Sequence, residues 1–216
     1  MNITGNLKRK VGRYVLDKQT RSKVRKVRSC NLREAKSIGI LFDATLPLSF
    51  DIIKDLVKDL SSSAKEIMVL GYVDSKQMID HYLYRKGFEF FTRNHLNWFY
   101  KPQSEAVNEF IKKDFDIMLN LCLEQSYPVN YIFALSNAKF KAARFFENNM
   151  QADLMINIEK EKASILELQK ELTKEQQKLR GHRTSYDKIA ESKTHSELQL
   201  NFLINQLVHY LSQIKN

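Results

Sequence analysis

Short apolar runs alternate with amphipathic stretches between residues 37 and 158. Ser37 to Asp43 (SIGILFD), Glu66 to Val73 and Phe115 to Leu121 are almost wholly apolar, which is typical of strands covered on both faces. Phe88 to Thr92 and Asp153 to Ile158 predict two shorter strands. The run from residue 115 to 121 is too apolar to alternate between core and solvent, so we predict that it is a central strand of a parallel sheet.

Apolar residues at helical spacing occupy the segments between these strands. The predicted helices are Phe50 to Leu60, Ser75 to Lys86, Ser104 to Lys113 and Val129 to Ala138, and Lys139 to Phe145 is extended again. Tyr127-Pro128 is predicted to break the chain before the last of these helices. Alternating strands and helices predict an α/β fold, a small Rossmann-like and mostly parallel sheet with helices on both faces.

The composition changes after Ile158. A seven-residue apolar repeat predicts a long exposed helix over Glu159 to Leu179, and Gly181 to Ser185 is predicted to turn the chain into a last helix. We therefore predict a C-terminal helical hairpin whose last helix packs on the sheet, with binding of a protein partner as the alternative. The residues of the two seams are Ile158, Ile165, Leu172 and Leu179, and Leu200, Leu203, Leu207, Tyr210 and Ile214.

The length and composition fit one substantial core with appendages. The chain has 216 residues, of which 43% are hydrophobic. We expect a basic N-terminal arm or helix over residues 1–36, an α/β domain over 37–158 and a helical hairpin over 159–216.

The net charge lies entirely in the N-terminal arm. Residues 1–36 hold twelve Lys and Arg against Asp17 and Glu34, a net charge of +10 that equals the net charge of the whole chain. A helix is plausible over Leu7 to Arg28, with Leu7, Val11, Tyr14 and Val15 on one face, but this apolar stripe does not continue beyond Lys18. A membrane-surface helix needs a continuous stripe, so the pattern favours a polyanion as the partner.

RNA is the partner that we expect for this arm, and the ribosome in particular. Each Lys or Arg that neutralises a phosphate releases a counterion, which gives an affinity that weakens steeply with salt. The alternatives are a solvated tail, a surface that binds an acidic protein, or binding to DNA. The predicted contacts are Lys8, Arg9, Lys10, Arg13, Lys18, Arg21, Lys23, Arg25, Lys26 and Arg28.

The loop from Asn94 to Pro102 places aromatic residues between cations. Trp98 and Phe99 could stack on unpaired bases beside Arg93 and Lys101. A place for Trp98 at the edge of the core is favoured, because apolar loops in α/β proteins commonly cover a sheet edge.

Polar residues follow three of the predicted strands. Asp43, Asp74, Asn120 and Glu124 could line a ligand crevice at the carboxyl ends of the strands, together with Cys122. Such residues are also ordinary turn formers and helix caps, and this structural role is favoured.

Several classes of function lack their motifs. The six glycines form neither GxGxxG nor a Walker loop, so no nucleotide cofactor is expected. The histidines occur in no metal or nucleophile motif, and Cys30 and Cys122 are too isolated to indicate zinc or a disulfide framework, so no metal is expected and a reducing cytoplasm fits. The longest uncharged run, Gln125 to Ala138, is shorter than the roughly 20 residues of a membrane span.

Several strings resemble a family of small uncharacterised bacterial α/β proteins of unknown function. They are SIGILFDAT, LGYVDSK, LNWFYKP, FDIMLNLCLEQSYPVNYIFALSNAKFKA, ADLMI and LINQLVHYLSQI. Residues 159–197 look like an insertion relative to that family pattern, and Ala143 stands at a position where the pattern leads us to expect Gly. The resemblance implies a compact α/β protein and assigns no catalytic residue.

Two shorter similarities suggest enzymes. FDIMLNL followed by ALSNAKFKA resembles the N-terminal half of heptosyltransferase-type glycosyltransferases, although the half with the nucleotide-sugar site has no counterpart. LFDATL resembles the first motif of haloacid-dehalogenase-type phosphatases, but Thr45 stands where their second Asp is needed. We therefore expect a non-enzymatic cytoplasmic RNA-binding protein, with a small-ligand-binding α/β enzyme as the first alternative and a protein-interaction scaffold as the second.

Overall fold

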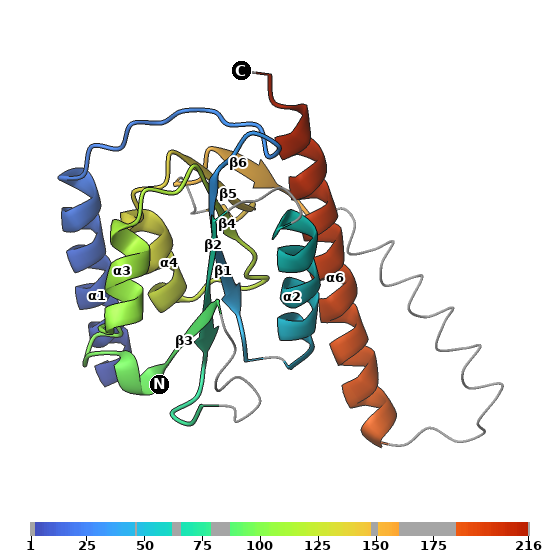
Figure 1. The fold of residues 1–216 in the computed structure, drawn as a ribbon. Coiled ribbons are helices and arrows are strands. Elements are labelled where there is room, and N and C mark those ends of the chain that lie inside the picture. Colours follow the sequence, from blue (N-terminus) through green and yellow to red (C-terminus); the bar gives the residue numbers. More distant parts are fainter. Residues whose placement is uncertain are drawn as a thin grey trace.

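The structure is a computed structural model that describes residues 3–45, 47–61, 66–78, 87–147, 151–159 and 185–215. Its centre is a six-stranded sheet in which every strand pair is parallel (Figure 1). The strand order is β3-β2-β1-β4-β5-β6, so the order reverses between β1 and β4. The strands are β1 (Ser37–Asp43), β2 (Glu66–Val73), β3 (Phe88–Thr92), β4 (Ile117–Asn120), β5 (Phe140–Arg144) and β6 (Leu154–Ile156).

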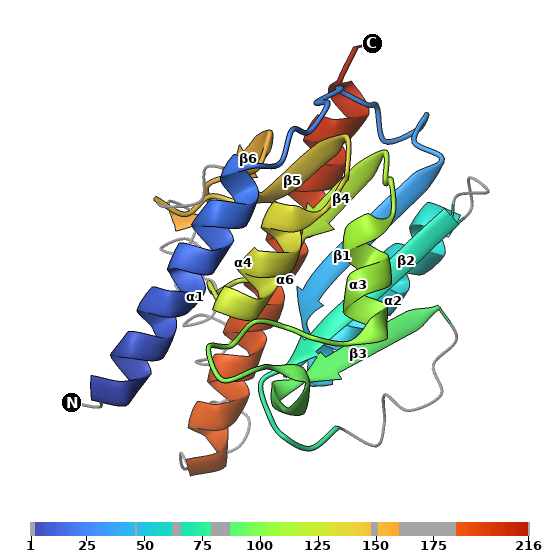
Figure 2. The same ribbon diagram turned by 90° about the vertical axis from the view of Figure 1, so that its left-hand side faces the viewer.

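Helices cover both faces of the sheet. Figure 2 shows α1, α3 and α4 side by side over one face, and Figure 1 shows α2 and α6 over the other. The predicted Rossmann-like α/β fold is therefore confirmed. The α-helices among the described residues are α1 (Ile3–Arg21), α2 (Pro47–Ser61), α3 (Glu105–Lys112), α4 (Tyr127–Leu135) and α6 (Ser185–Gln213), and η2 (Arg93–His95) is a 3-10 turn.

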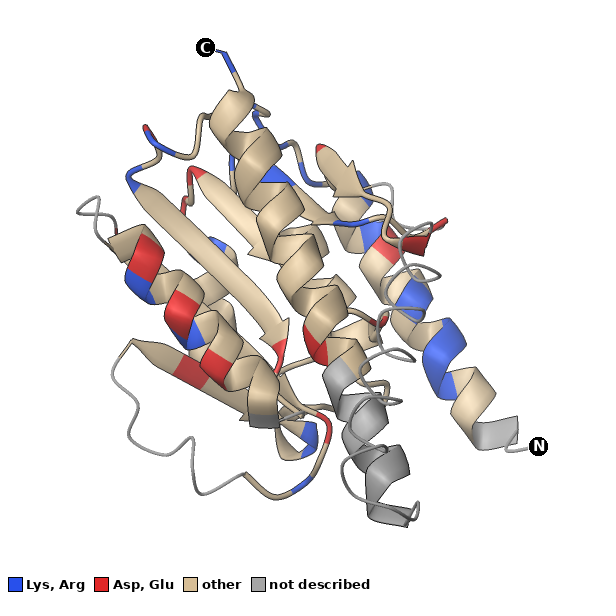
Figure 3. Cartoon of the chain, turned by 90° about the vertical axis from the view of Figure 1, so that its right-hand side faces the viewer, with Lys and Arg blue, Asp and Glu red and all other residues tan. Residues whose placement is uncertain are grey.

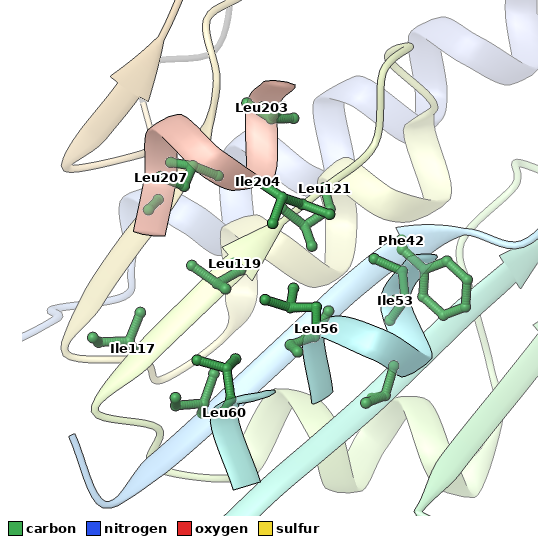
Figure 4. Packing of buried hydrophobic residues seen from close by; sticks show 14 of the residues in the cluster. Phe42, Ile53, Leu56, Leu60, Ile117, Leu119, Leu121, Leu203, Ile204 and Leu207 are labelled. Atoms are coloured by element: carbon green, nitrogen blue, oxygen red, sulfur yellow. The ribbon is translucent and has the colours of Figure 1, made fainter. Parts of the chain in front are cut away.

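The larger core lies between the sheet and the α2/α6 layer. The alternate residues Ile38, Ile40 and Phe42 of β1 point to this side, and residues at helical spacing on α2 and α6 meet them (Figure 4). All are almost fully buried. Their removal from water is the main stabilising contribution of this layer, about 1.5–3 kcal/mol for each fully buried large side chain. The helix residues in contact with the sheet include Ile53, Leu56, Leu60, Leu203, Ile204 and Leu207.

A second core lies under α3 and α4. Val107 and Phe110 of α3 and Ile132 and Phe133 of α4 pack on Leu41 and Met118 of the sheet, among other residues. Ser104 caps α3, because its Oγ accepts a hydrogen bond from the backbone N–H of Val107 at 3.3 Å. The two cores together enclose the sheet, which explains why its strands are apolar on both faces.

The segment that follows α1 crosses from one layer to the other. Residues 23–30 have no regular structure, and Figure 1 shows this segment passing over one end of the sheet. Asn31 Nδ2 donates to the backbone oxygens of Ser212 (3.1 Å) and Ile214 (2.8 Å) at the end of α6. The predicted helix over Leu7 to Arg28 is thus wrong beyond Arg21.

Two helix boundaries also differ from the predictions. Tyr127-Pro128 does not precede α4 but forms its first turn, because proline lacks only an N–H that the first turn does not use. The helix expected over Ser75 to Lys86 is not formed at residues 75–78, and residues 79–86 lie outside the described residues. The first arm of the predicted hairpin, Glu159 to Leu179, lies outside them except for Glu159, and so does most of its turn.

Candidate functional site

Helix α1 is docked on the folded body through a glycine. A Cβ atom at Gly12 would lie 2.8 Å from the backbone oxygen of Phe99 and 2.9 Å from Cζ of Tyr127, so only glycine permits this approach. Tyr127 Oη donates to the backbone oxygen of Gly12 at 2.7 Å, and Tyr131 Oη donates to Gln19 Oε1 at 2.6 Å. The arm is therefore a fixed element up to Arg21.

The face that α1 buries differs from the predicted apolar face. Leu16 is buried in a small cluster with Tyr131, Ala134 and Leu135 of α4. Leu7 and Tyr14, which the sequence pattern placed on one apolar face with Val11 and Val15, are 60% and 69% exposed. Because glycine adds nothing to a hydrophobic pattern, a face centred on Gly12 was not visible in it.

Most of the basic side chains of the arm remain free of acidic partners. Within the described part of the chain, Lys8, Arg9, Lys10, Arg13, Lys18, Arg21, Lys26 and Arg28 form no ion pair with Asp or Glu. Asp17 is the only acidic residue of α1. Figure 3 shows Lys and Arg gathered along α1, whereas α2 carries both signs of charge. Six of these unpaired cations lie on the docked helix α1, and Lys26 and Arg28 follow it in the irregular segment.

Two predicted phosphate contacts are used inside the protein instead. Arg25 forms two hydrogen bonds with the carboxylate of Asp153, Nη1 to Oδ2 at 2.8 Å and Nη2 to Oδ1 at 2.6 Å, and Nη1 also donates to backbone oxygens at Ala138 and Lys139. Lys23 Nζ donates to the backbone oxygen of Leu135. Both side chains therefore fix the segment after α1 to the body rather than extend into solvent.

Lys141 lies beside these residues and is almost fully buried. Its Nζ donates to the backbone oxygens of Phe133 (2.6 Å) and Ala134 (3.1 Å) at the C-terminal end of α4. Burial, with Arg25 and Lys23 as nearby cations, lowers the pKa of Lys141 to about 7. The geometry assigns Lys141 a structural role, because it satisfies carbonyls that a helix end leaves unpaired.

A cleft of about 1080 Å³, which we call the α1 cleft, opens beside the N-terminal helix. It is bounded by α1, the end of β2, the loop from residue 93 to 100 and the start of α4. Lys8, Arg9 and Arg13 line it from α1, and Lys76 and Arg93 from the β2 and β3 ends. Five cations thus face two acidic side chains, Asp17 and Asp74.

Trp98 lines this cleft and is 58% exposed, so the favoured expectation that it covers the edge of the core is wrong. Phe99 is half-buried beside it, with the two rings edge to face at 5.1 Å. The hydrogen bonds of Asn97 give the physical reason. Its Oδ1 accepts from the backbone N–H groups of Phe99 (3.1 Å) and Lys101 (2.9 Å) and closes a tight turn that carries the Trp98 side chain outward.

The four residues of the predicted ligand crevice do not form one site. Asp43 and Glu124 line a small cavity of about 130 Å³ under α2 and α6, whereas Asp74 lines the α1 cleft. Asn120 is buried, and its Oδ1 accepts from the backbone N–H of Cys122 at 3.2 Å.

Each of these polar residues also has a local structural role. Asp43 Oδ1 accepts from the backbone N–H of Thr45 at 2.8 Å, which is a turn. Arg93 donates to both carboxylate oxygens of Asp74, at 2.6 and 2.9 Å, and these hydrogen bonds lower the pKa of Asp74. Cys122 is buried and its thiol pKa is raised well above the ordinary value by burial, so it is no nucleophile.

Some residues of the α1 cleft were not singled out from the sequence. Lys76 and Ser126 follow a strand and precede a helix, positions at which polar residues are ordinary. The only sequence signal at Ser126 was its place before Tyr127-Pro128, a pattern that suits the start of a helix. Tyr100, which also lines the cleft, has a positive φ of 68° that no sequence pattern indicated.

No group of three or more His, Cys, Asp or Glu side chains is placed to hold a metal ion within the part of the chain that the structure describes. Among the same residues, no helix has both the length and the apolar character needed to cross a membrane.

Comparison with known proteins gives one match. A family model described as a family of unknown function (DUF6913) matches residues 8–178 of the chain. No curated protein and no solved structure matches it.

Proposed function

Because the chain belongs to DUF6913, a family whose function is unknown, we propose a function from its own surface: the protein binds RNA through the unpaired cations of α1. The observation that carries the proposal is the set of Lys and Arg residues that α1 presents without acidic partners while its other face is packed on α4. Lys10, Lys18 and Arg21 are exposed on its outer side.

The placement of these cations favours binding to a phosphate backbone. A docked helix holds its charges at fixed positions, so less conformational freedom is lost on binding than with a loose tail. Residues 37–216 have no net charge, so the positive potential is concentrated in the arm, to which α1 contributes six of the twelve cations. Such a surface gives an affinity that depends on salt and not on sequence.

RNA is favoured over DNA because an exposed tryptophan shares the cleft with the cations. Recognition of RNA relies on unpaired bases that stack on aromatic side chains, whereas reading of duplex DNA uses a helix or strand in a groove. The ribosome presents a large surface of structured RNA, so we propose it as the first candidate partner. No activity is proposed for Asp43, Asp74, Asn120 and Glu124, since only Asp43 and Glu124 line the same cavity and each of the first three has a local structural role.

The experiment that tests the proposal removes charge and keeps the helix. Deletion of the arm would expose the packed residues of α4, so we choose the triple variant Lys10→Gln, Lys18→Gln, Arg21→Gln. The matched control, Lys54→Gln, Lys58→Gln, Lys112→Gln, loses the same charge at exposed positions of α2 and α3. Binding of a labelled single-stranded RNA is measured by fluorescence anisotropy over a range of salt, with ribosome co-sedimentation in parallel.

The α1 variant is expected to bind more weakly. The negative slope of log K against log salt is expected to become shallower by about 0.7 for each lost contact, while the control retains the wild-type slope. Equal binding by both variants would overturn the role of α1. Preferential binding of an acidic peptide or of duplex DNA would overturn RNA as the partner.

A further inference from the structure

The turn that carries Trp98 is rigid and strained. Asn97 N–H donates to the backbone oxygen of Lys101 at 2.9 Å, and Tyr100 N–H donates to the backbone oxygen of Asn97 at 3.0 Å. Together with the two hydrogen bonds to Asn97 Oδ1, they hold Tyr100 at a φ of 68°, which is unfavourable for a bulky residue. The fold therefore maintains a costly conformation in a turn that exposes an aromatic ring to water.

The charge that the α1 cleft presents to a ligand is more positive than a count of its charged lining residues suggests. Asp74 is held by both Arg93 hydrogen bonds and by Tyr72 Oη, which donates to Asp74 Oδ1 at 2.7 Å, so its carboxylate is already satisfied. Lys8, Arg9 and Arg13 have no such partner among the described residues. Their charge is available to a phosphate group.

The start of α4 adds an uncompensated polar group to the cleft. Ser126 precedes the helix, but its side chain makes no capping hydrogen bond, and its Oγ is buried with no hydrogen-bond partner among the described residues. Ser126, Tyr127 and Pro128 all line the cleft. The positive end of the helix dipole and the cations of α1 thus lie along the same hollow.

The volume of the cleft leaves room for more than one nucleotide. At about 1080 Å³ it lies at the upper end of the range of about 300–1,000 Å³ that is common for small-molecule pockets. It lies along the surface between α1 and the turn of residues 97–101. These features suit a short stretch of chain that enters and leaves the cleft.

We propose that the α1 cleft holds unpaired nucleotides of single-stranded RNA, with a base stacked on Trp98 and the adjoining phosphates against Lys8, Arg9 and Arg13. This inference rests on the proposed function and adds a preference for unpaired strands over duplexes. Trp98 determines that preference, because only an unpaired base can present its face to the ring.

The chain provides its own probe for the test, because Trp98 is its only tryptophan. The intact protein is titrated with a single-stranded RNA, with the duplex of the same sequence and with AMP, and tryptophan fluorescence and anisotropy of labelled RNA are followed together. The single strand is expected to quench Trp98 as it binds, whereas the duplex is expected to bind without comparable quenching.

Two substitutions complete the design. Trp98→Ala is expected to weaken single-strand binding about 5- to 150-fold, the range given by loss of one stacked base, and to leave duplex binding unchanged. Trp98→Phe is expected to retain most of the affinity. Tyr210→Ala is the matched control, because Tyr210 is 48% exposed on α6 and lies outside the cleft; it is expected to change neither affinity.

The outcomes separate the two proposals. Salt-dependent RNA binding without quenching, unaffected by Trp98→Ala, would overturn the role of the cleft and leave binding by α1 standing. A wild-type protein that binds no RNA would overturn both. Quenching by AMP together with no response to RNA would also overturn both, and would indicate a site for a small nucleotide.

Discussion

Arg25 and Asp153 form a bidentate ion pair that joins the segment after α1 to the segment before β6. The two side chains are only 17% and 16% exposed, and the same carboxylate accepts a hydrogen bond from the backbone N–H of Lys141 at 2.8 Å. This contact fixes the chain that leads out of α1, so the orientation of the basic helix depends on it.

Its energy is measurable by a double-mutant cycle with Arg25→Ala and Asp153→Ala. We expect a coupling free energy of about 1–3 kcal/mol in chemical denaturation, because both charged groups are partly desolvated. The Arg93 and Asp74 pair is also bidentate but is about half exposed, so the corresponding cycle is expected to give a clearly smaller coupling. Equal coupling in the two cycles would contradict the role of burial.

Substitution of Gly12 tests how α1 is docked. Gly12→Ala is expected to lower the free energy of unfolding by about 1–3 kcal/mol, because the new methyl group would overlap the backbone oxygen of Phe99. Asn6→Ala introduces the same residue at an exposed position of α1 and is expected to have little effect or a slightly stabilising one. If urea titration shows that Gly12→Ala is as stable as Asn6→Ala, the close approach of α1 is wrong.

Lys141 is expected to make stability depend on pH. Its pKa is about 7 in the folded protein and about 10.5 in the unfolded chain, so between these values the unfolded state binds more protons and stability rises with pH. The rise contributed by this group is at most about 1.4 kcal/mol per pH unit.

The measurement compares wild type and Lys141→Met by urea unfolding at pH 7, 8 and 9. Lys141→Met is expected to flatten the rise, whereas Lys18→Met, at an exposed position of α1, is expected to keep it. Parallel curves for wild type and Lys141→Met would contradict the lowered pKa, because they would show that the buried amine stays protonated up to pH 9.

Both cysteines are expected to react more slowly with an alkylating reagent in the folded protein than in the unfolded chain. Cys122 is buried with a strongly raised thiol pKa, so it is expected to remain unmodified at pH 8 in the folded protein. Cys30 is half-buried and burial also raises its pKa, so it is expected to react slowly. Peptide mass spectrometry should find both modified in denaturant, and rapid labelling of Cys122 without denaturant would contradict its place in the core.

The sheet was the most predictable part of the molecule. β1, β2 and β3 have the predicted bounds, because each is an apolar run between polar or turn-forming residues. The pattern of apolar residues along a strand indicates which of its two faces are buried, and it can be read from the strand's own residues. The start of α4 was missed because Pro128 can either end a segment or occupy a first helical turn, and the choice depends on what the helix packs against.

The candidate site was less predictable, because its geometry depends on distant partners. The unpaired cations of α1 could be named from the sequence, but the use of Lys23 and Arg25 inside the protein depends on Leu135 and Asp153, more than 100 residues away. Trp98 was expected at the edge of the core because its hydrophobicity can be seen in the sequence, whereas the turn formed by Asn97 cannot. Asp43 and Asp74 follow neighbouring strands but line different hollows, since one lies under the α2/α6 layer and the other beside α1.

The distance in sequence between α1 and α4, on which it packs, also has a consequence during synthesis of the chain. The hydrogen bond between Tyr127 and Gly12 spans 115 residues, so the helix made first cannot settle until α4 has been translated. Closure of so long a loop favours late attachment of α1, after the local strand and helix contacts have formed. A nascent chain of this protein therefore exposes its basic helix until α4 has been made.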